Sequence, residues 1–330
     1  MTVRVGVIGV GLIGEDHVRR LTTVLDDAPV TAVTDVDSGR AAAVAEKYGV
    51  GTVHASGEAV IADPQVDAVV VASWGPTHEQ YVLAAITAGK PVFCEKPLAT
   101  TPEACERVLA AETAAGRRLV QVGFMRRYDP AYRALRAAVW DGSIGAPLLA
   151  HMAHRNPAVP PSVASEDAIN DSAVHEIDVT RWLLDEEITS VMVLSPRRSS
   201  LAADGLQDPM VVMFRTASGV LVDDELALNV RYGYDIRADV VGETGHVQLP
   251  ADGPVPPDWR VRFADAYDTE FRAWTADVAA GRPPGGPGAW DGYAATVVAG
   301  ACVSALKSGT WTEVVLRDRP GLYRQEEVAR

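Results

Sequence analysis

Three groups of residues, far apart along the chain, have the types and spacing that a single reaction needs. The pattern Gly-x-Gly-x-x-Gly at residues 9–14 follows the apolar run Val5–Ile8 and opens a predicted helix, which is the strand–turn–helix context of a dinucleotide site. Asp171 and His175 stand four residues apart, so a regular helix would present a carboxylate and an imidazole on one face. Lys96 follows another apolar run. This combination predicts hydride transfer from an alcohol to a nicotinamide.

The glycine turn has a physical reason at each position. Gly9 permits the tight turn, Gly11 lets the backbone approach a pyrophosphate, and Gly14 lets the helix pack closely on the strand. The N-terminus of the helix then directs free N–H groups and the positive end of its dipole at the phosphates. A purely structural glycine turn is the alternative, and the strand–turn–helix context favours the dinucleotide.

Asp35 ends the second predicted strand, 21 residues after Gly14. At this position a carboxylate accepts hydrogen bonds from the ribose hydroxyls of the adenosine, and it would repel a 2′-phosphate. Asp37 adds to that repulsion, and Arg40 is expected to point into solvent. The sequence therefore favours NAD over NADP. A strand-end cap is the alternative role for Asp35.

A further stretch follows the apolar run Ala68–Ala72, at the carboxyl edge where open parallel sheets bind ligands. We expect Ser73, Trp74 and Thr77 to lie beside the cofactor, with Trp74 near the nicotinamide ribose. For His78 alone, a surface position behind a turn capped by Thr77 is an equally good interpretation.

Lys96 and His175 are the candidates for the chemical step. Lys96 lies at the same sheet edge, where a cation stabilises a substrate oxygen as it gains alkoxide character and contacts the nicotinamide ribose. Pro97 restricts Lys96 to an extended conformation, and the bond between them is a candidate for a cis peptide. His175 is the natural proton acceptor because imidazole titrates near neutral pH, and Asp171 would orient it.

Asp178 lies three residues after His175 on roughly the same face, which makes a metal site the rival interpretation of this cluster. The sequence His175-Glu176-Ile177-Asp178 lacks the second histidine of a zinc protease helix. We therefore predict no metal.

Other polar residues fit a ligand that carries many hydroxyl groups and has no bulky apolar part. They are Arg126, Arg127, His154, Arg155, Asn156 and the stretch Tyr232–Asp235. For any one of them alone, a solvated loop or sheet position is the more common role.

The first third of the chain alternates short apolar runs with helical patterns, which is typical of an α/β Rossmann fold with a parallel sheet covered on both faces. Strands are expected at Val3–Ile8, Val30–Thr34, Ala68–Ala72, Pro91–Cys94 and Leu119–Val122, and helices at Leu12–Leu25, Gly39–Tyr48, His78–Ala88 and Pro102–Ala115. We expect a nucleotide-binding domain at residues 1–123.

Residues 124–330 follow a different pattern. Helices are expected at Ala131–Trp140, Ser172–Leu184, Asp265–Ala280 and Ala289–Leu306, with a strand at Pro147–Met152 and further strands from Thr189 to Leu249. Hairpin turns are indicated at residues 217–219 and 242–245. The pattern predicts an α+β domain for substrate binding and oligomerisation, built on an open, mostly antiparallel sheet.

Charge and composition restrict the partners. The formal net charge of −14 over 330 residues argues against nucleic acid and against an anionic membrane surface. Met1–Arg4 lead directly into the first predicted strand, so we expect no targeting segment and a cytoplasmic location. Cys94, Cys105 and Cys302 lack metal-ligand spacing and are expected to be reduced and buried.

Several longer stretches resemble the Gfo/Idh/MocA oxidoreductases and, within them, the bacterial inositol 2-dehydrogenases. Glu95-Lys96-Pro97 is the mark of the broad family. Residues 125–129 (Met-Arg-Arg-Tyr-Asp) and 154–157 (His-Arg-Asn-Pro) are more particular to the inositol enzymes. The resemblance covers nearly the whole chain. It implies ordered, NAD-dependent oxidation of myo-inositol to scyllo-inosose in inositol catabolism, by a homotetramer joined through the open sheets.

The resemblance also assigns residues. Lys96, Asp171 and His175 would be catalytic, and the cyclitol would be surrounded by Met125, Arg126, His154, Asn156, Asp171, His175, Asp178 and Tyr234. The cofactor would be bound by Gly9, Gly11, Leu12, Ile13, Gly14, Asp35, Ser73, Trp74, Thr77, Glu95 and Lys96.

Two features depart from the family pattern: Leu12 replaces a small or polar residue beside the pyrophosphate, and the stretch Pro250–Pro257 is short and proline-rich. Two alternatives stay open. One is the same chemistry on another polyol, such as scyllo- or D-chiro-inositol or a pyranose sugar. The other is an NAD-sensing regulator without catalysis, which would have no need of the three catalytic residues together.

Overall fold

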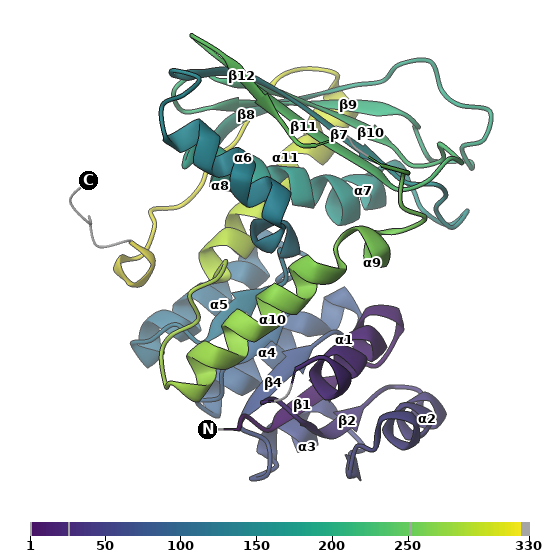
Figure 1. The fold of residues 1–330 in the computed structure, drawn as a ribbon, viewed down its shortest axis with the longest axis vertical. Coiled ribbons are helices and arrows are strands. Elements are labelled where there is room, and N and C mark those ends of the chain that lie inside the picture. Colours follow the sequence, from purple (N-terminus) through teal and green to yellow (C-terminus); the bar gives the residue numbers. More distant parts are fainter. Residues whose placement is uncertain (1, 26, 251–252, 325–330) are drawn as a thin grey trace. The chain divides into compact units, whose positions relative to one another are not determined.

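The structure, a computed structural model, describes residues 2–25, 27–250 and 253–324 (Figure 1). The chain divides into two compact units. The first unit holds the N-terminal residues through Phe124, the segment Asp268–Thr296 and the C-terminal stretch that begins at Arg317. The second unit holds Met125–Tyr267 and Val297–Leu316.

The first unit is built on a parallel sheet with the strand order β3-β2-β1-β4-β5-β6. The strands are β1 (Val5–Ile8), β2 (Val30–Thr34), β3 (Thr52–Val53), β4 (Ala68–Val71), β5 (Val92–Cys94) and β6 (Val120–Val122). This order reverses direction between β1 and β4, which makes the crevice at their carboxyl ends the place where a dinucleotide binds in a Rossmann fold.

The helices of this sheet connect successive strands. They are α1 (Leu12–Thr23), α2 (Ser38–Tyr48), α3 (Gly57–Ala62), α4 (His78–Thr87) and α5 (Pro102–Ala115), with a 3₁₀ turn η1 (Gly75–Thr77) before α4 and another, η4 (Gly321–Tyr323), near the C-terminus. All predicted strands and helices of this region are confirmed. The sequence missed β3, which has two exposed residues, and α3, which has only six residues.

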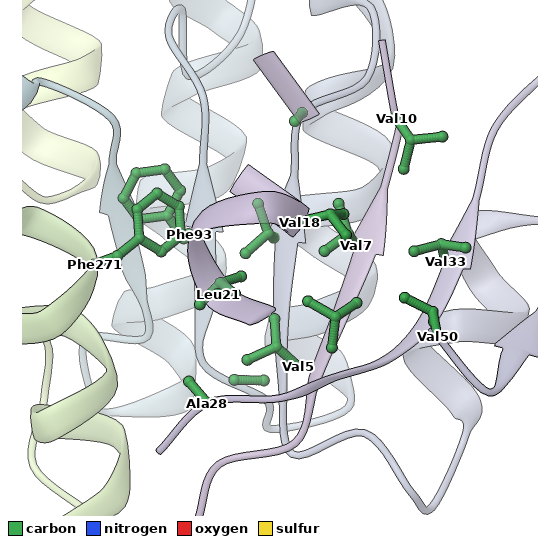
Figure 2. Packing of buried hydrophobic residues seen from close by; sticks show 14 of the residues in the cluster. Val5, Val7, Val10, Val18, Leu21, Ala28, Val33, Val50, Phe93 and Phe271 are labelled. Atoms are coloured by element: carbon green, nitrogen blue, oxygen red, sulfur yellow. The ribbon is translucent and has the colours of Figure 1, made fainter. Parts of the chain in front are cut away.

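The core of the first unit explains why a C-terminal segment belongs to it. Phe271 of α10 (Ala264–Ala279) is fully buried in the same apolar cluster as Val5, Val7 and Phe93 (Figure 2). Trp274 of the same helix is also fully buried in this cluster. The ring centroids of Phe93 and Phe271 are 4.3 Å apart. The compact units therefore differ from the contiguous division at residues 123 and 124, because these aromatic side chains bury their surface against the nucleotide-binding sheet.

The second unit contains a mixed sheet with the order β12-β11-β7-β10-β9-β8-β13, in which only the pair β7–β10 is parallel. Its strands are β7 (Pro147–Arg155), β8 (Ile188–Leu194), β9 (Met210–Thr216), β10 (Leu221–Ala227), β11 (Asp235–Gly242), β12 (His246–Gln248) and β13 (Thr312–Glu313). The expected open, mostly antiparallel sheet is confirmed, as are the hairpins β9–β10 and β11–β12.

Helices α6 (Pro130–Trp140) and α8 (Val174–Leu184) lie against one face of this sheet (Figure 1). Shorter helical segments are η2 (Met125–Tyr128), α7 (Ser165–Ala168), the π-helical turn η3 (Ile169–Ala173) and α9 (Trp259–Arg262). Residues 251 and 252 of the proline-rich stretch Pro250–Pro257 lie outside the described residues.

Helix α11 (Ala289–Ser308) is the one helix among the described residues that is long and apolar enough to cross a membrane by length and hydropathy. Within its most apolar window, 61% of the helix is buried in the protein. Its fully buried residues include Ala294, Val298 and Cys302. Such burial is typical of a core helix.

Two local predictions are confirmed. Cys94, Cys105 and Cys302 are free thiols and are buried. The peptide bond between Lys96 and Pro97 is cis.

Candidate functional site

A cavity of about 450 Å³ opens at the carboxyl ends of β1, β2 and β4, within the first unit. Six of the predicted cofactor residues line it: Gly9, Gly11, Asp35, Ser73, Trp74 and Thr77. Ala55, Ser56 and Tyr81 also line it, and sequence reasoning did not single these residues out. Leu12, Ile13, Gly14, Glu95 and Lys96 are not among the lining residues.

The three glycines of the turn meet different demands. Gly9 has φ +86°, and a Cβ there would lie 2.5 Å from Cα of Ser73. A Cβ on Gly14 would lie 2.0 Å from the carbonyl oxygen of Gly9, so only glycine lets α1 start this close to the turn. At Gly11 the nearest atom to such a Cβ is 3.9 Å away, which leaves its backbone open to a ligand.

Asp35 is held in place by the backbone around it. Its Oδ2 accepts a hydrogen bond from N–H of Val10 at 2.8 Å, and its Oδ1 accepts one from N–H of Asp37 at 2.9 Å. Arg40 is exposed, as expected, but its guanidinium also lies 3.4 Å from Oδ1 and lines the cavity. The carboxylate of Asp35 attracts the guanidinium of Arg40 because the two side chains have opposite charges and lie only five residues apart in the chain.

One exposed apolar side chain of the cavity wall is that of Trp74, which is 77% exposed although it follows a buried strand. Leu12, which does not line the cavity, is 65% exposed. The loop that carries Trp74 is closed by a hydrogen bond of 2.7 Å between the hydroxyls of Ser73 and Thr77. Open backbone at Gly11, a fixed carboxylate and apolar surface are what a dinucleotide requires, so the residues present fit NAD.

Lys96 lies two residues past the end of β5 in the first unit, and two side chains hold the backbone of Lys96 and of Pro97. The N–H of Lys96 donates to Oε2 of the buried Glu95 at 3.2 Å. The carbonyl of Pro97 is 2.7 Å from Nδ1 of His78, and Nε2 of the same ring is 2.9 Å from the carbonyl of Ser73. His78 is 1% exposed, so its interpretation as a surface residue is wrong, and burial lowers its pKa.

In the second unit the backbone near His175 departs from the expected helix. Ile169–Ala173 form a π-helical turn, and regular α-helix begins only at Val174. The expectation of a regular helix from Ser172 is therefore wrong, and the argument from a spacing of four residues does not hold across the turn. Asp171 is exposed, whereas His175 is buried at the start of α8.

His175 is part of a group of buried rings. The ring centroids of His154 and His175 are 6.3 Å apart, and those of His154 and Tyr234 are 5.6 Å apart. Burial raises the pKa of Tyr234 to about 12, which keeps its hydroxyl protonated at neutral pH. Of the remaining predicted substrate residues, Met125 is buried and Asn156 is partly buried.

Charged residues lie behind these rings. Arg126 is 1% exposed and forms an ion pair with Glu176, whose other carboxylate oxygen is 3.0 Å from Nδ1 of His154. Although burial opposes the charged form, Glu176 holds the pKa of Arg126 well above its ordinary value. Burial would likewise raise the pKa of Glu176, yet Arg126 and His154 keep it lowered. The predicted substrate residue Arg126 thus contacts His154 in two ways: directly, with Nη2 3.2 Å from Nδ1 of the ring, and through Glu176.

Asp178 is engaged by a different arginine. Both of its carboxylate oxygens accept from Arg127, at 2.9 and 2.5 Å, and Asp178 is 1% exposed.

Sequence reasoning missed Glu176 as a separate functional group and missed Asp224 altogether. Asp224 is fully buried in β10, where burial raises its pKa well above the ordinary value and the neighbouring Glu176 adds to this. Buried and partly buried residues alternate along β10, and Asp224 occupies a buried position between Val222 and Leu226. This alternation could have identified Asp224 as a buried carboxylate from the sequence.

Within residues 2–25, 27–250 and 253–324, no group of three or more His, Cys, Asp or Glu side chains could hold a metal ion.

Comparison with known proteins agrees with this geometry. Residues 3–124 match the model of the Gfo/Idh/MocA oxidoreductase family with its NAD-binding Rossmann fold, and residues 132–248 match the Gfo/Idh/MocA C-terminal domain. The chain belongs to the Gfo/Idh/MocA oxidoreductase family. It is an NAD-dependent oxidoreductase, and its cofactor is NAD.

Similar relatives extend over the full length. The chain is 55% identical to inositol 2-dehydrogenase 3 from Saccharopolyspora erythraea and 53% identical to inositol 2-dehydrogenase from Acidothermus cellulolyticus, with 98% of each chain covered. It superposes on myo-inositol dehydrogenase from Lactobacillus casei, in complex with NAD(H) and myo-inositol, with a TM-score of 0.96 and 39% identity. That match covers 98% of this chain and 100% of the other.

A scyllo-inositol dehydrogenase from Lactobacillus casei has the same fold. The TM-score is 0.88 at 25% identity, with 95% of this chain and 98% of the other covered.

Proposed function

We propose that this enzyme is an inositol 2-dehydrogenase that oxidises myo-inositol to scyllo-inosose with NAD. The observation that carries the proposal is the buried ring group of His175, His154 and Tyr234 in a chain that also holds a dinucleotide cavity. The named activities of the full-length relatives in Saccharopolyspora and Acidothermus support the substrate class.

The proposal assigns each residue a task in one reaction. His175 removes the proton of the reacting hydroxyl, and Lys96 stabilises the negative charge that develops on that oxygen. Asp171 favours the imidazolium of His175 after proton transfer. Bound NAD supplies the acceptor of the carbinol hydride.

The other predicted residues select the substrate. His154 and Tyr234 offer hydrogen-bonding groups on rigid, buried rings, and Asn156 and Met125 complete the proposed contacts. Arg126 acts on the imidazole of His154 both directly and through their shared partner Glu176. Asp178 shares its carboxylate with Arg127, so the proposal gives it a smaller part in binding.

The test is a substrate panel at mildly alkaline pH, with nicotinamide absorbance as the readout. NAD and myo-inositol should give the fastest initial rate, with NADP and the other polyols slower. Turnover of another polyol but not of myo-inositol would keep the chemistry and refute the proposed substrate. NAD binding without turnover of any polyol would refute the proposed activity.

A second candidate is oxidation of scyllo-inositol, because a scyllo-inositol dehydrogenase shares the fold. The two isomers differ in the configuration of one hydroxyl, so the position of hydrogen-bonding partners decides between them. The ratio of kcat/KM for the two isomers distinguishes these candidates.

We also propose that the enzyme works in inositol catabolism in the cytoplasm as a homotetramer joined through the open sheet of the second unit. One face of this sheet carries side chains that are only partly buried, such as Met213, Leu221 and Val241. Their strand neighbours Val212 and Val222, which point to the other face, are fully buried. Light scattering coupled to gel filtration measures the mass in solution, and a monomeric mass would refute this assembly.

A further inference from the structure

His17 is a fully buried histidine of α1 in the first unit, and the reaction as described so far makes no use of it. Its Nε2 lies 2.7 Å from Oε1 of Glu95, and its Nδ1 lies 2.9 Å from Nη1 of Arg20. The imidazole therefore bridges an arginine and the carboxylate that precedes Lys96.

These two contacts determine where the imidazole carries its proton. A guanidinium has only donors, so Nδ1 must accept the hydrogen bond from Arg20. A neutral imidazole has one N–H, which then stands on Nε2 and donates to Glu95. Burial lowers the pKa of His17, which agrees with a neutral ring. If Nδ1 carried a proton, its N–H would face the N–H of Arg20, and no hydrogen bond could form between the two donors.

The groups around the ring hold it in this orientation. The ring packs against Phe93 at 5.9 Å and against Phe271 of α10 at 4.5 Å between centroids. Arg20 is itself fixed by two carboxylates, Asp16 of α1 at 2.8 Å and Asp268 of α10 at 2.6 Å. His17 thus joins Arg20, Asp16, Asp268 and Glu95 in one hydrogen-bonded network.

Glu95 connects His17 to Lys96, the proposed catalytic lysine. One carboxylate oxygen accepts from His17, and the other accepts from the backbone N–H of Lys96. A Cβ at Gly123 would lie 3.2 Å from Cδ and both oxygens of Glu95, so glycine at this position leaves room for the carboxylate. Loss of the N–H from His17 would leave Oε1 of a buried carboxylate without this donor.

We propose that His17 is a positioning residue for Lys96, a neutral imidazole whose Nε2–H orients the Glu95 carboxylate that holds the lysine backbone. The inference rests on the proposed function for the role of Lys96 in catalysis. The tautomer and the hydrogen-bond network are independent of it.

The tautomer is tested first, on the unmodified protein. Two-dimensional ¹H–¹⁵N spectra distinguish protonated from unprotonated ring nitrogens, and among the seven histidines the His17 signals are those that disappear in His17→Gln. The expected result is a protonated Nε2 and an unprotonated Nδ1 from pH 6 to pH 8. A proton on Nδ1, or on both nitrogens, would overturn the proposal whether or not any inositol is oxidised.

Kinetics of two variants test the positioning role. His17→Phe keeps a ring between Phe93 and Phe271 but removes both hydrogen bonds, and kcat should fall about ten- to hundredfold, as when a supporting hydrogen bond to a reactive group is lost. The Kd for NAD should stay within about threefold, because Lys96 is not part of the cavity wall. His17→Gln offers an amide N–H to Glu95 and an amide oxygen to Arg20, and it should restore most of kcat.

His54→Phe is the matched control, since His54 also pairs with a carboxylate, Asp63, at 2.8 Å in the same unit. It should leave kcat within about twofold. An unchanged kcat in folded His17→Phe would overturn the positioning role. Equal losses in His17→Phe and His17→Gln would do the same, since they would show that only packing matters. If no polyol is oxidised by the wild-type enzyme, the proposed function fails, while the tautomer result still decides the network.

Discussion

The two units differ in how exposed their candidate functional residues are. In the first unit, the cavity is lined by the glycine turn and by the short segments that follow the other strands, and Trp74 in its wall stays largely exposed. In the second unit, His175, His154 and Tyr234 are buried, and Arg126 and Glu176 form an ion pair behind them. The cofactor site is thus specified by short strand-end motifs, whereas the proposed substrate site uses buried charges supplied by distant segments.

The largest effect should come from breaking the buried ion pair of the second unit. Arg126→Met leaves Glu176, which is 1% exposed, without its cation, and the loss of stability should be about 3–5 kcal/mol. Arg107→Met is the control, because Arg107 is 59% exposed in its pair with Glu79 and its loss should change stability far less. Urea unfolding followed by tryptophan fluorescence measures both. Equal losses would show that burial does not distinguish the pairs.

In the first unit, a single methyl group should weaken cofactor binding. Gly14→Ala places Cβ 2.0 Å from the carbonyl oxygen of Gly9, so α1 must move and NAD should bind at least about tenfold more weakly. Gly300→Ala is the control, since a Cβ there meets nothing within 4 Å. Isothermal titration calorimetry with NAD measures the change. Normal affinity in Gly14→Ala would show that the turn tolerates displacement.

The carboxylate at the end of β2 should act mainly on the choice of cofactor. Asp35→Ser removes a charged partner of the ribose hydroxyls, and affinity for NAD should fall about tenfold while the preference over NADP decreases. Asp37→Ser should change the ratio less than about threefold, because Asp37 is exposed and its side chain caps α2. The ratio of kcat/KM for NAD and NADP is the measurement. If Asp35→Ser left the ratio of kcat/KM for NAD and NADP unchanged, residues other than Asp35 would determine the choice of cofactor.

The smallest effect concerns pH. Because burial lowers the pKa of His17 below its ordinary value of 6.5, the unfolded chain binds more protons than the folded one below that pH. The stability from a neutral His17 is thus complete above pH 6.5 and is lost as pH falls. His17→Gln should reduce the slope of stability against pH by at most about 1.4 kcal/mol per unit between pH 6.5 and 5. Denaturant midpoints at several pH values measure it, with the exposed His246→Gln as the unchanged control.

The sequence predicted the first unit well because its rules are local. A glycine needed at a tight turn and an aspartate at a strand end each act within a few residues. The sequence predicted helix α10 but not its place in the fold: Phe271 and Trp274 join a core assembled from residues more than 170 positions away.

The second unit was harder to predict for the same reason. Asp171 and His175 suit a regular helix by spacing, and only the structure reveals the π-helical turn between them. The pairing of Arg126 with Glu176, and of Arg127 with Asp178, joins segments about fifty residues apart. Long-range pairing of this kind leaves no periodic trace in a single sequence.

The central claim is that cofactor binding depends on the first unit and proton transfer depends on the second. The most direct test compares His175→Ala with the wild-type enzyme, with kcat measured on myo-inositol and the Kd for NAD measured by calorimetry. We expect kcat to fall by about a thousandfold while the Kd for NAD stays within about twofold. A Kd that rises in proportion to the loss of activity, or a kcat that is retained, would contradict the account.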